Sequence, residues 1–282
     1  MSKPSVLDLD GAVAGDRVLD GLTVDLYYDL ILDETRLPPR KKLDGTTFPS
    51  VMQDFHHGVN IWKDPKLPAT LQHLGISGDS HIKGSPIQDW KQVTDFFRKK
   101  KPRVIAEFGV FRGSSSIRMA KILDQLTPEV PELKDSFIVS VDTWILDLQF
   151  VWSQKALSSN YFQGPKLAGR ELMYFVFLAN VMAANMMHRI IPLPSATSNA
   201  IQAFLAHGIR LDFCYLDASH ANPDVFLDLV GVWRILDSGG VVVCDDLQVD
   251  AVKIAVLRFV ERYADEITYH FQPGKQFWIY KK

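Results

Sequence analysis

The stretch Arg103-Val-Ile-Ala-Glu-Phe-Gly-Val-Phe-Arg-Gly-Ser-Ser115 decides which fold this sequence adopts. Residues 103–108 form a short apolar run that is typical of a buried strand, and a helical pattern follows from 114 to about 126. Between the two, Gly109 and Gly113 allow backbone N–H groups to approach a bound molecule, and the start of the helix adds a positive field. The sequence therefore predicts a strand, a ligand-binding turn and a helix in immediate succession.

The alternation of apolar strands and helices continues to the end of the chain. Further strands are expected at 137–141, 189–193, 211–216, 241–244, 267–271 and 276–280, with a turn at 238–240, and helices at 85–101, 170–187, 198–207, 223–236 and 249–264. Strands that alternate with helices form a parallel sheet covered on both faces. We therefore expect an α/β fold with a Rossmann-like, doubly wound, seven-stranded mixed sheet, whose last two strands form an antiparallel edge.

The first 85 residues have a different composition, which is rich in Pro, Gly, Asp and His. Residues 37–50 are predicted to form a loop. We interpret residues 1–85 as an irregular N-terminal extension with one or two short helices. It can serve as a lid or as the contact of a homodimer, while residues 86–282 form the main domain.

Charge, hydropathy and cysteine content exclude several classes of protein. The 282 residues include 31 Lys and Arg against 33 Asp and Glu, and a net charge of −2 argues against a nucleic-acid partner. The longest apolar stretch, residues 174–187, contains two asparagines and is too short to cross a bilayer. The N-terminus lacks the apolar core of a signal peptide, and Cys214 and Cys244 do not make a disulfide framework. We expect a cytoplasmic protein without a membrane partner.

The spacing of the two glycines indicates what the turn binds. A dinucleotide site needs G-x-G-x-x-G for its pyrophosphate, whereas this turn reads G-x-x-x-G and follows the acid Glu107. A carboxylate there repels a pyrophosphate and suits a cationic amino group. The alternative is a tight turn that binds nothing.

The pattern E-x-G-x-x-x-G-x-S resembles motif I of class I S-adenosylmethionine-dependent methyltransferases, in the form found in catechol O-methyltransferase and its relatives. The resemblance implies that the methionine half of S-adenosyl-L-methionine is lined by Glu107, Gly109, Phe111, Gly113 and Ser115.

The second strand ends in Val-Asp142-Thr143-Trp144. A carboxylate at this position can accept hydrogen bonds from both hydroxyls of a ribose; alternatively, Asp142 only caps the segment that follows. V-D-T-W also resembles macrocin-type O-methyltransferases, although the Gly-Asp pair usual after their Trp is replaced by Ile145-Leu-Asp147. By the same resemblance, Thr143 also lines the cofactor and Ser195, after the third strand, contacts its adenine.

Acidic residues follow two strands that this fold makes neighbours. Asp217 ends the fourth strand, and Asp245 and Asp246 end the fifth. Three carboxylates this close repel one another unless a cation lies between them, and oxygen ligands suit Mg²⁺ or another divalent cation. Metal-dependent O-methyltransferases, which the chain resembles, carry acids at these positions. The alternative is that all three acids face solvent in a metal-free methyltransferase.

His220 lies three residues beyond Asp217, where catechol O-methyltransferase has a lysine base; macrocin-type relatives read D-G-D-H, and this chain reads D-A-S-H. The ordinary pKa of histidine lies near neutral pH, so we expect His220 to act as a general base or to contact the substrate, with Asp217 beside it. Metal ligation and capping of the next helix are the alternatives.

Together these residues predict a methyltransferase domain at 86–282 that transfers a methyl group from S-adenosylmethionine to a hydroxyl of a small molecule, assisted by a divalent metal. The alternatives are a metal-independent methyltransferase that acts on N, C or O, and a protein that binds S-adenosylmethionine without catalysis. The missing middle glycine disfavours a nicotinamide dehydrogenase.

Overall fold

The structure, a computed structural model, describes residues 39, 41, 45–65, 67, 90–145, 166–167, 170–271 and 276–282. All of them belong to one of the two units of the chain, Pro38–Lys282. The extension boundary expected at 85/86 falls outside the described residues and stays a prediction.

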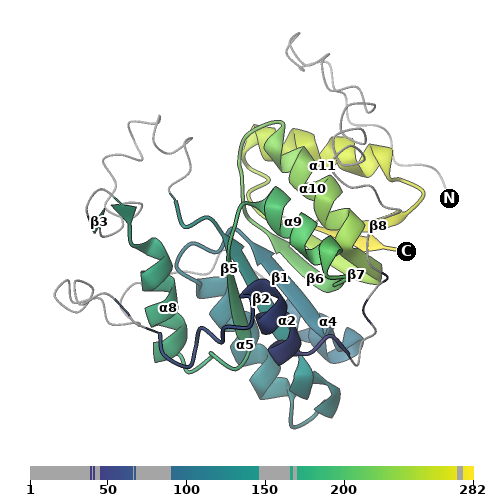
Figure 1. The fold of residues 1–282 in the computed structure, drawn as a ribbon. Helices are drawn as coiled ribbons and strands as arrows, with labels where there is room; N and C mark the ends of the chain where they lie inside the picture. The colour runs from purple at the N-terminus through teal and green to yellow at the C-terminus, as the bar shows by residue number, and fades with distance from the viewer. Residues whose placement is uncertain are drawn as a thin grey trace. The chain divides into compact units, whose positions relative to one another are not determined.

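A seven-stranded sheet with the order β5-β2-β1-β6-β7-β9-β8 forms the centre of this unit (Figure 1). The strands are β1 (Val104–Phe108), β2 (Phe137–Asp142), β5 (Ile190–Pro194), β6 (Leu211–Leu216), β7 (Leu236–Cys244), β8 (Ile267–Phe271) and β9 (Phe277–Lys281). The first five are parallel, and β9 runs antiparallel to both β7 and β8. The predicted mixed sheet is confirmed.

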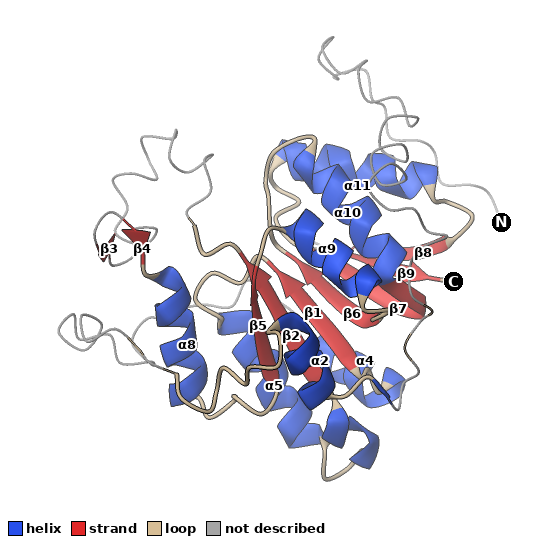
Figure 2. Cartoon of the chain, in the orientation of Figure 1, coloured by secondary structure: helices blue, strands red, loops and turns tan. Residues whose placement is uncertain are grey.

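Helices cover both faces of the sheet, with α4 and α5 on one face and α9, α10 and α11 on the other (Figure 2). The helices are α2 (Phe48–Phe55), α4 (Trp90–Lys100), α5 (Ser114–Leu126), the 3₁₀ helix η3 (Pro131–Asp135), α8 (Met173–Ala183), α9 (Thr197–Ala206), α10 (Asp224–Ile235) and α11 (Asp250–Arg262). All residues of β1 are buried, which explains why its sequence is continuously apolar apart from Glu107.

The order of the strands places the cleft. From β1 the chain moves outward through β2 to β5, and then returns to β6 on the other side of β1. Such a reversal opens a crevice beyond the carboxyl ends of the two adjacent strands, and this crevice is where open α/β sheets bind ligands. The turn after β1 and the acids after β6 and β7 therefore lie at the same edge of the sheet.

The free edge of β5 is covered by side chains from the segment 45–65. The indole N–H of Trp62 donates to the carbonyl of Ile190 at 2.9 Å, and Nε2 of His56 donates to the carbonyl of Pro192 at 2.7 Å. Burial lowers the pKa of His56. Proline fits this edge because its missing N–H would point away from the sheet.

Three local expectations were wrong. Residues 37–50 do not all form a loop, because α2 begins at Phe48, where Thr47 and Ser50 form a reciprocal capping box. The helix expected from Arg170 begins at Met173, since β3 (Lys166–Leu167) and β4 (Arg170–Glu171) pair as a short antiparallel ladder.

The turn expected at 238–240 is part of β7, which is longer than predicted. Gly239 has a φ of +81°, and the register with β6 shifts between Leu211 and Phe213. A glycine in this conformation allows an irregularity within a strand where the sequence indicated a break.

Among the described helices, none combines the length and the hydropathy that a membrane span requires. The cytoplasmic location stays a prediction.

Candidate active site

The turn after β1 lies directly against the end of β6. Gly109 has a φ of +84°, and a Cβ on it would lie 1.8 Å from the carbonyl oxygen of Asp217. The N–H of Asp217 donates to the carbonyl of Phe108 at 2.8 Å. Gly113, with a φ of +88°, faces the ring of Phe177 in the same way. These close approaches explain why both positions need glycine.

Glu107 is fully buried below this turn. Its two carboxyl oxygens accept hydrogen bonds from the hydroxyls of Ser115 and Ser116, and Ser116 also bonds Ser140 at 2.6 Å. Burial raises the pKa of Glu107 to about 8, against the opposing effect of the serine bonds. The carboxyl group therefore fastens α5 to β1, and its contact with a cofactor, like that of Ser115, stays a prediction.

Asp142, at the tip of β2, organises the backbone of the turn. One carboxylate oxygen accepts from the N–H groups of Val110 and Phe111 at 2.7 and 2.8 Å, and the other accepts from Trp144 at 2.6 Å. Burial raises the pKa of Asp142. Because these N–H groups are bonded to Asp142, they are not oriented toward a pyrophosphate, which agrees with the absence of a dinucleotide motif.

Thr143 and Ser195 lie next to Asp142. Thr143 is exposed, and the backbone N–H of Ser195 donates to the carbonyl of Asp142 at 2.9 Å. Phe111 is half-buried and has a φ of +51°. Their contacts with a cofactor stay predictions.

Two residues that sequence reasoning did not assign hold the turn in place. The indole N–H of Trp144 donates to the carbonyl of Phe111 at 2.8 Å, and its ring lies 4.9 Å from that of Phe177 in α8. Asn180, also in α8, is buried and donates to the carbonyl of Arg112 at 2.8 Å. For Asn180 the sequence did contain a signal, because an asparagine in an otherwise apolar helix indicates a buried hydrogen bond.

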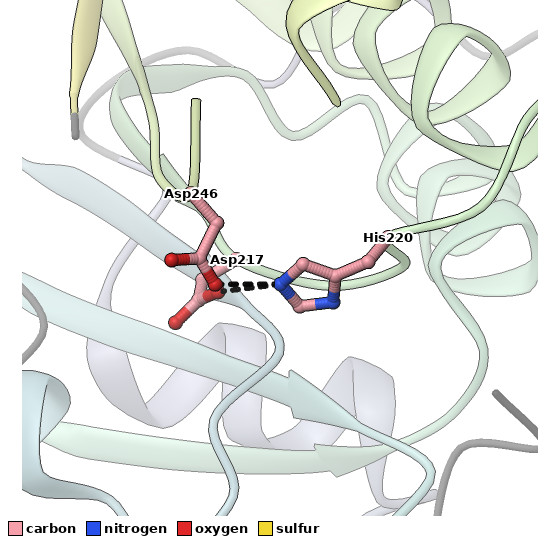
Figure 3. Close-up of side chains that lie close together, drawn as sticks. All are labelled: Asp217, His220 and Asp246. Atoms are coloured by element: carbon pink, nitrogen blue, oxygen red, sulfur yellow. Dashed lines mark hydrogen bonds and ion pairs between the residues drawn. The ribbon is translucent and has the colours of Figure 1, made fainter. Parts of the chain in front are cut away.

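At the ends of β6 and β7 the structure brings together Asp217, His220 and Asp246 (Figure 3). Nε2 of His220 lies 2.7 Å from Oδ2 of Asp246 and 3.7 Å from Oδ1 of Asp217. One ligand atom from each residue lies within 4.8 Å of the others. All three side chains are partly buried, so a cation among them would be only partly hydrated.

Asp245 takes a different place from its neighbour. It is buried, and its Oδ2 accepts a hydrogen bond from the hydroxyl of Tyr215 at 2.8 Å. Asp246 has a φ of +56°, which turns the two consecutive carboxylates apart. The structure therefore brings two of the three predicted acids together and adds His220, while ligation by Asp245 stays a prediction.

Burial and the carboxylates of Asp245 and Asp246 raise the pKa of Asp217 well above its usual range. Such mutual repulsion is relieved when a cation binds. Carboxylate oxygens and an imidazole nitrogen are all common ligands of divalent metals. The residues present therefore fit a divalent cation.

A small pocket, with room for about one water molecule, adjoins this cluster and is lined by residues that include Asp217, His220, Asp245 and Asp228 of α10. Burial raises the pKa of Asp228 to about 8. The pocket lies where β6, β7 and α10 meet.

Comparisons with known proteins find solved structures that are similar to this chain. A provisional O-methyltransferase from Klebsiella pneumoniae has a TM-score of 0.50 at 14% identity, over 79% of this chain and 94% of that one. An O-methyltransferase from Bacillus cereus in complex with SAH has a TM-score of 0.48 at 16% identity, and the match covers 76% of this chain and 90% of that one. TomG from Streptomyces achromogenes is an O-methyltransferase of tomaymycin synthesis whose structure was solved with SAM. It has a TM-score of 0.47 at 17% identity, and the match covers 91% of this chain and 94% of that one. No curated protein matches the sequence.

The sheet order and the glycine turn define the class I methyltransferase fold. The model of a methyltransferase domain matches residues 106–247, from β1 to just beyond the acids after β7. The chain belongs to this methyltransferase family, and the resemblance seen in its sequence is confirmed.

Proposed function

We propose that the protein transfers a methyl group from S-adenosylmethionine to a hydroxyl of a small molecule with the help of a divalent cation. The observation that carries the proposal is the cluster of Asp217, His220 and Asp246 at the end of the two strands next to the glycine turn. A bound cation would lower the pKa of an acceptor hydroxyl and orient it.

The residues of the chain would bind and align the two reactants. Asp142 presents a carboxylate beside the turn, where it can accept hydrogen bonds from a nucleoside ribose while it fixes Val110 and Phe111. The acids after β6 and β7 would hold the acceptor side of the cleft. Alignment of two bound reactants can be worth roughly 7–11 kcal/mol of the barrier.

The test is methyl transfer from S-adenosylmethionine to a panel of catechols and sugar diols, followed by mass spectrometry. We expect turnover that EDTA removes and that an added divalent metal restores. Asp217→Asn should lower the rate at least about 100-fold, because it weakens both the charge and the ligand strength at the cluster. Asp95→Asn, on the exposed surface of α4, is the matched control and should leave the rate unchanged.

Other results would point to the alternative functions. Turnover that survives both EDTA and Asp217→Asn would indicate a metal-independent methyltransferase. Binding of S-adenosylhomocysteine without turnover on any acceptor would indicate a non-catalytic binding protein, and tighter binding of NADH would contradict the proposed cofactor.

A further inference from the structure

We infer that Nε2 of His220 is itself a metal ligand, so that this site holds a first-row transition-metal dication in preference to Mg²⁺. The ligands would be Oδ1 of Asp217, Nε2 of His220 and Oδ2 of Asp246. The inference rests on the proposed function for the presence of a cation, and it changes both the set of ligands and the kind of ion.

The first argument is the direction in which His220 points. Its Nε2 faces two carboxylate oxygens from different elements, which lie on the same side of the ring, 2.7 Å away for Asp246 and 3.7 Å away for Asp217 (Figure 3). Neighbouring ligands of a six-coordinate ion with bonds of about 2.1 Å lie about 3 Å apart. The two distances lie on either side of this value, so small side-chain movements would admit the ion.

The second argument is the orientation of the two consecutive acids. Gln248 donates a hydrogen bond to Oδ1 of Asp246, which leaves Oδ2 on the side of His220. Oδ2 of Asp245 instead accepts from the hydroxyl of Tyr215. If Asp245 turned toward the ion, the buried hydroxyl of Tyr215 would lose that acceptor, which is unfavourable because the hydroxyl is shielded from water.

The third argument is an oxygen without a partner. Oδ1 of Asp245 is buried and has no hydrogen-bond partner in the described part of the chain, and Asp245 lines the same pocket as Asp217 and His220. A buried carboxylate oxygen at this place can accept a hydrogen bond from a water molecule of the ion's coordination sphere. This assigns Asp245 to the outer sphere.

The set of ligands decides the kind of ion. Imidazole nitrogen favours first-row transition metals, whereas Mg²⁺ prefers a sphere made only of oxygen. A nitrogen ligand also excludes the base function for Nε2, because its lone pair cannot bind a metal and accept a proton at the same time.

Metal binding tests the inference without any methyl transfer. The full-length protein is titrated with Mn²⁺, free Mn²⁺ is measured by electron paramagnetic resonance, and Mg²⁺ is then added as a competitor. We expect Mn²⁺ to bind at least about tenfold more tightly than Mg²⁺, and pulsed spectra of bound Mn²⁺ to show coupling to an imidazole nitrogen.

Variants identify the ligands. His220→Ala should weaken Mn²⁺ binding at least about tenfold, change Mg²⁺ binding less than about threefold and abolish the nitrogen coupling. Asp245→Asn keeps an acceptor for Tyr215 and should alter Mn²⁺ affinity less than about threefold. His188→Ala, an exposed histidine paired with Asp124, controls for loss of an imidazole elsewhere.

Several results would overturn the inference: no ion bound, no nitrogen coupling in the unchanged protein, or a Mn²⁺ to Mg²⁺ preference that survives His220→Ala. Loss of Mn²⁺ binding in Asp245→Asn would indicate that Asp217, Asp245 and Asp246 are the ligands, as the sequence predicts. A chain that binds Mn²⁺ through His220 but methylates no acceptor would leave the inference intact and contradict the proposed function, so the two failures are distinguishable.

Discussion

At the scale of single residues, Gly109 allows the turn after β1 to contact the end of β6, because its missing side chain leaves room for the carbonyl of Asp217. Two effects oppose any larger residue there, the φ of +84° and the 1.8 Å distance that a Cβ would have from that oxygen. Gly58 has the same φ of +84°, but a Cβ on it would meet no atom within 4 Å in the described part of the chain. Alanine substitutions at Gly58 and at Gly109 therefore distinguish the cost of backbone strain from the cost of a steric clash.

We expect Gly58→Ala to lower the free energy of unfolding by about 1 kcal/mol, from the positive φ alone. Gly109→Ala should cost about 3 kcal/mol or more, since the end of β6 must also move. Urea denaturation of both variants measures the difference. Equal losses would mean that the turn and Asp217 are not in contact.

The acids show how far single residues could be read from the sequence. The sequence placed Asp217, Asp245 and Asp246 at the ends of neighbouring strands, and the strand order confirms this. It could not show which of two consecutive acids faces the cluster, because that depends on the φ of +56° at Asp246 and on the hydroxyl of Tyr215, 30 residues away in sequence from Asp245.

At the scale of elements, α8 and Trp144, the second residue after β2, hold the glycine turn from outside. Trp144 contributes one hydrogen bond, to the carbonyl of Phe111, and a ring that packs on Phe177 and Tyr174. Trp62 provides a matched comparison, since its indole also donates to a backbone carbonyl, but at the edge of β5.

We expect Trp144→Phe and Trp62→Phe each to lower the free energy of unfolding by about 1–2 kcal/mol, because each leaves a carbonyl without its donor. Only Trp144→Phe should weaken binding of S-adenosylhomocysteine, by about threefold or more, since the freed carbonyl belongs to the turn. Calorimetry measures both affinities. If the two variants bind it equally well, α8 and Trp144 do not position the turn for the cofactor.

Periodicity predicted the strands and most helices, because the buried faces of β1, β2, β6 and α5 give clear apolar patterns. Periodicity failed where the secondary structure depends on pairing with another strand and not on the local apolar pattern. Arg170 lies in a helix-like sequence but pairs with Leu167 across a short ladder, and Gly239 continues β7 through an irregularity instead of ending it. Neither partner is visible from local sequence.

At the scale of the whole molecule, buried acids couple stability to pH. Burial raises the pKa of Glu107 from 4.5 to about 8 and that of Asp228 from 3.8 to about 8. Between about pH 5 and pH 8 the folded chain holds protons on both groups, whereas the unfolded chain has released them. Unfolding therefore releases protons, and the free energy of unfolding falls as the pH rises through this window. His56, with a lowered pKa, acts in the opposite direction near pH 6.5.

We expect Glu107→Gln to reduce this slope, since glutamine fills the same space and carries no proton to release. Each such group contributes up to about 1.4 kcal/mol per pH unit, so the variant should lose about half of the combined slope from Glu107 and Asp228. Urea denaturation at pH 5.5, 6.5 and 7.5 measures it, and Glu129→Gln, an exposed acid, is the control. The expected result is a variant that loses less stability than the unchanged protein as the pH rises. A slope that Glu107→Gln leaves unaltered would mean that Glu107 is already ionised in the folded protein, with Ser115 and Ser116 compensating for its burial.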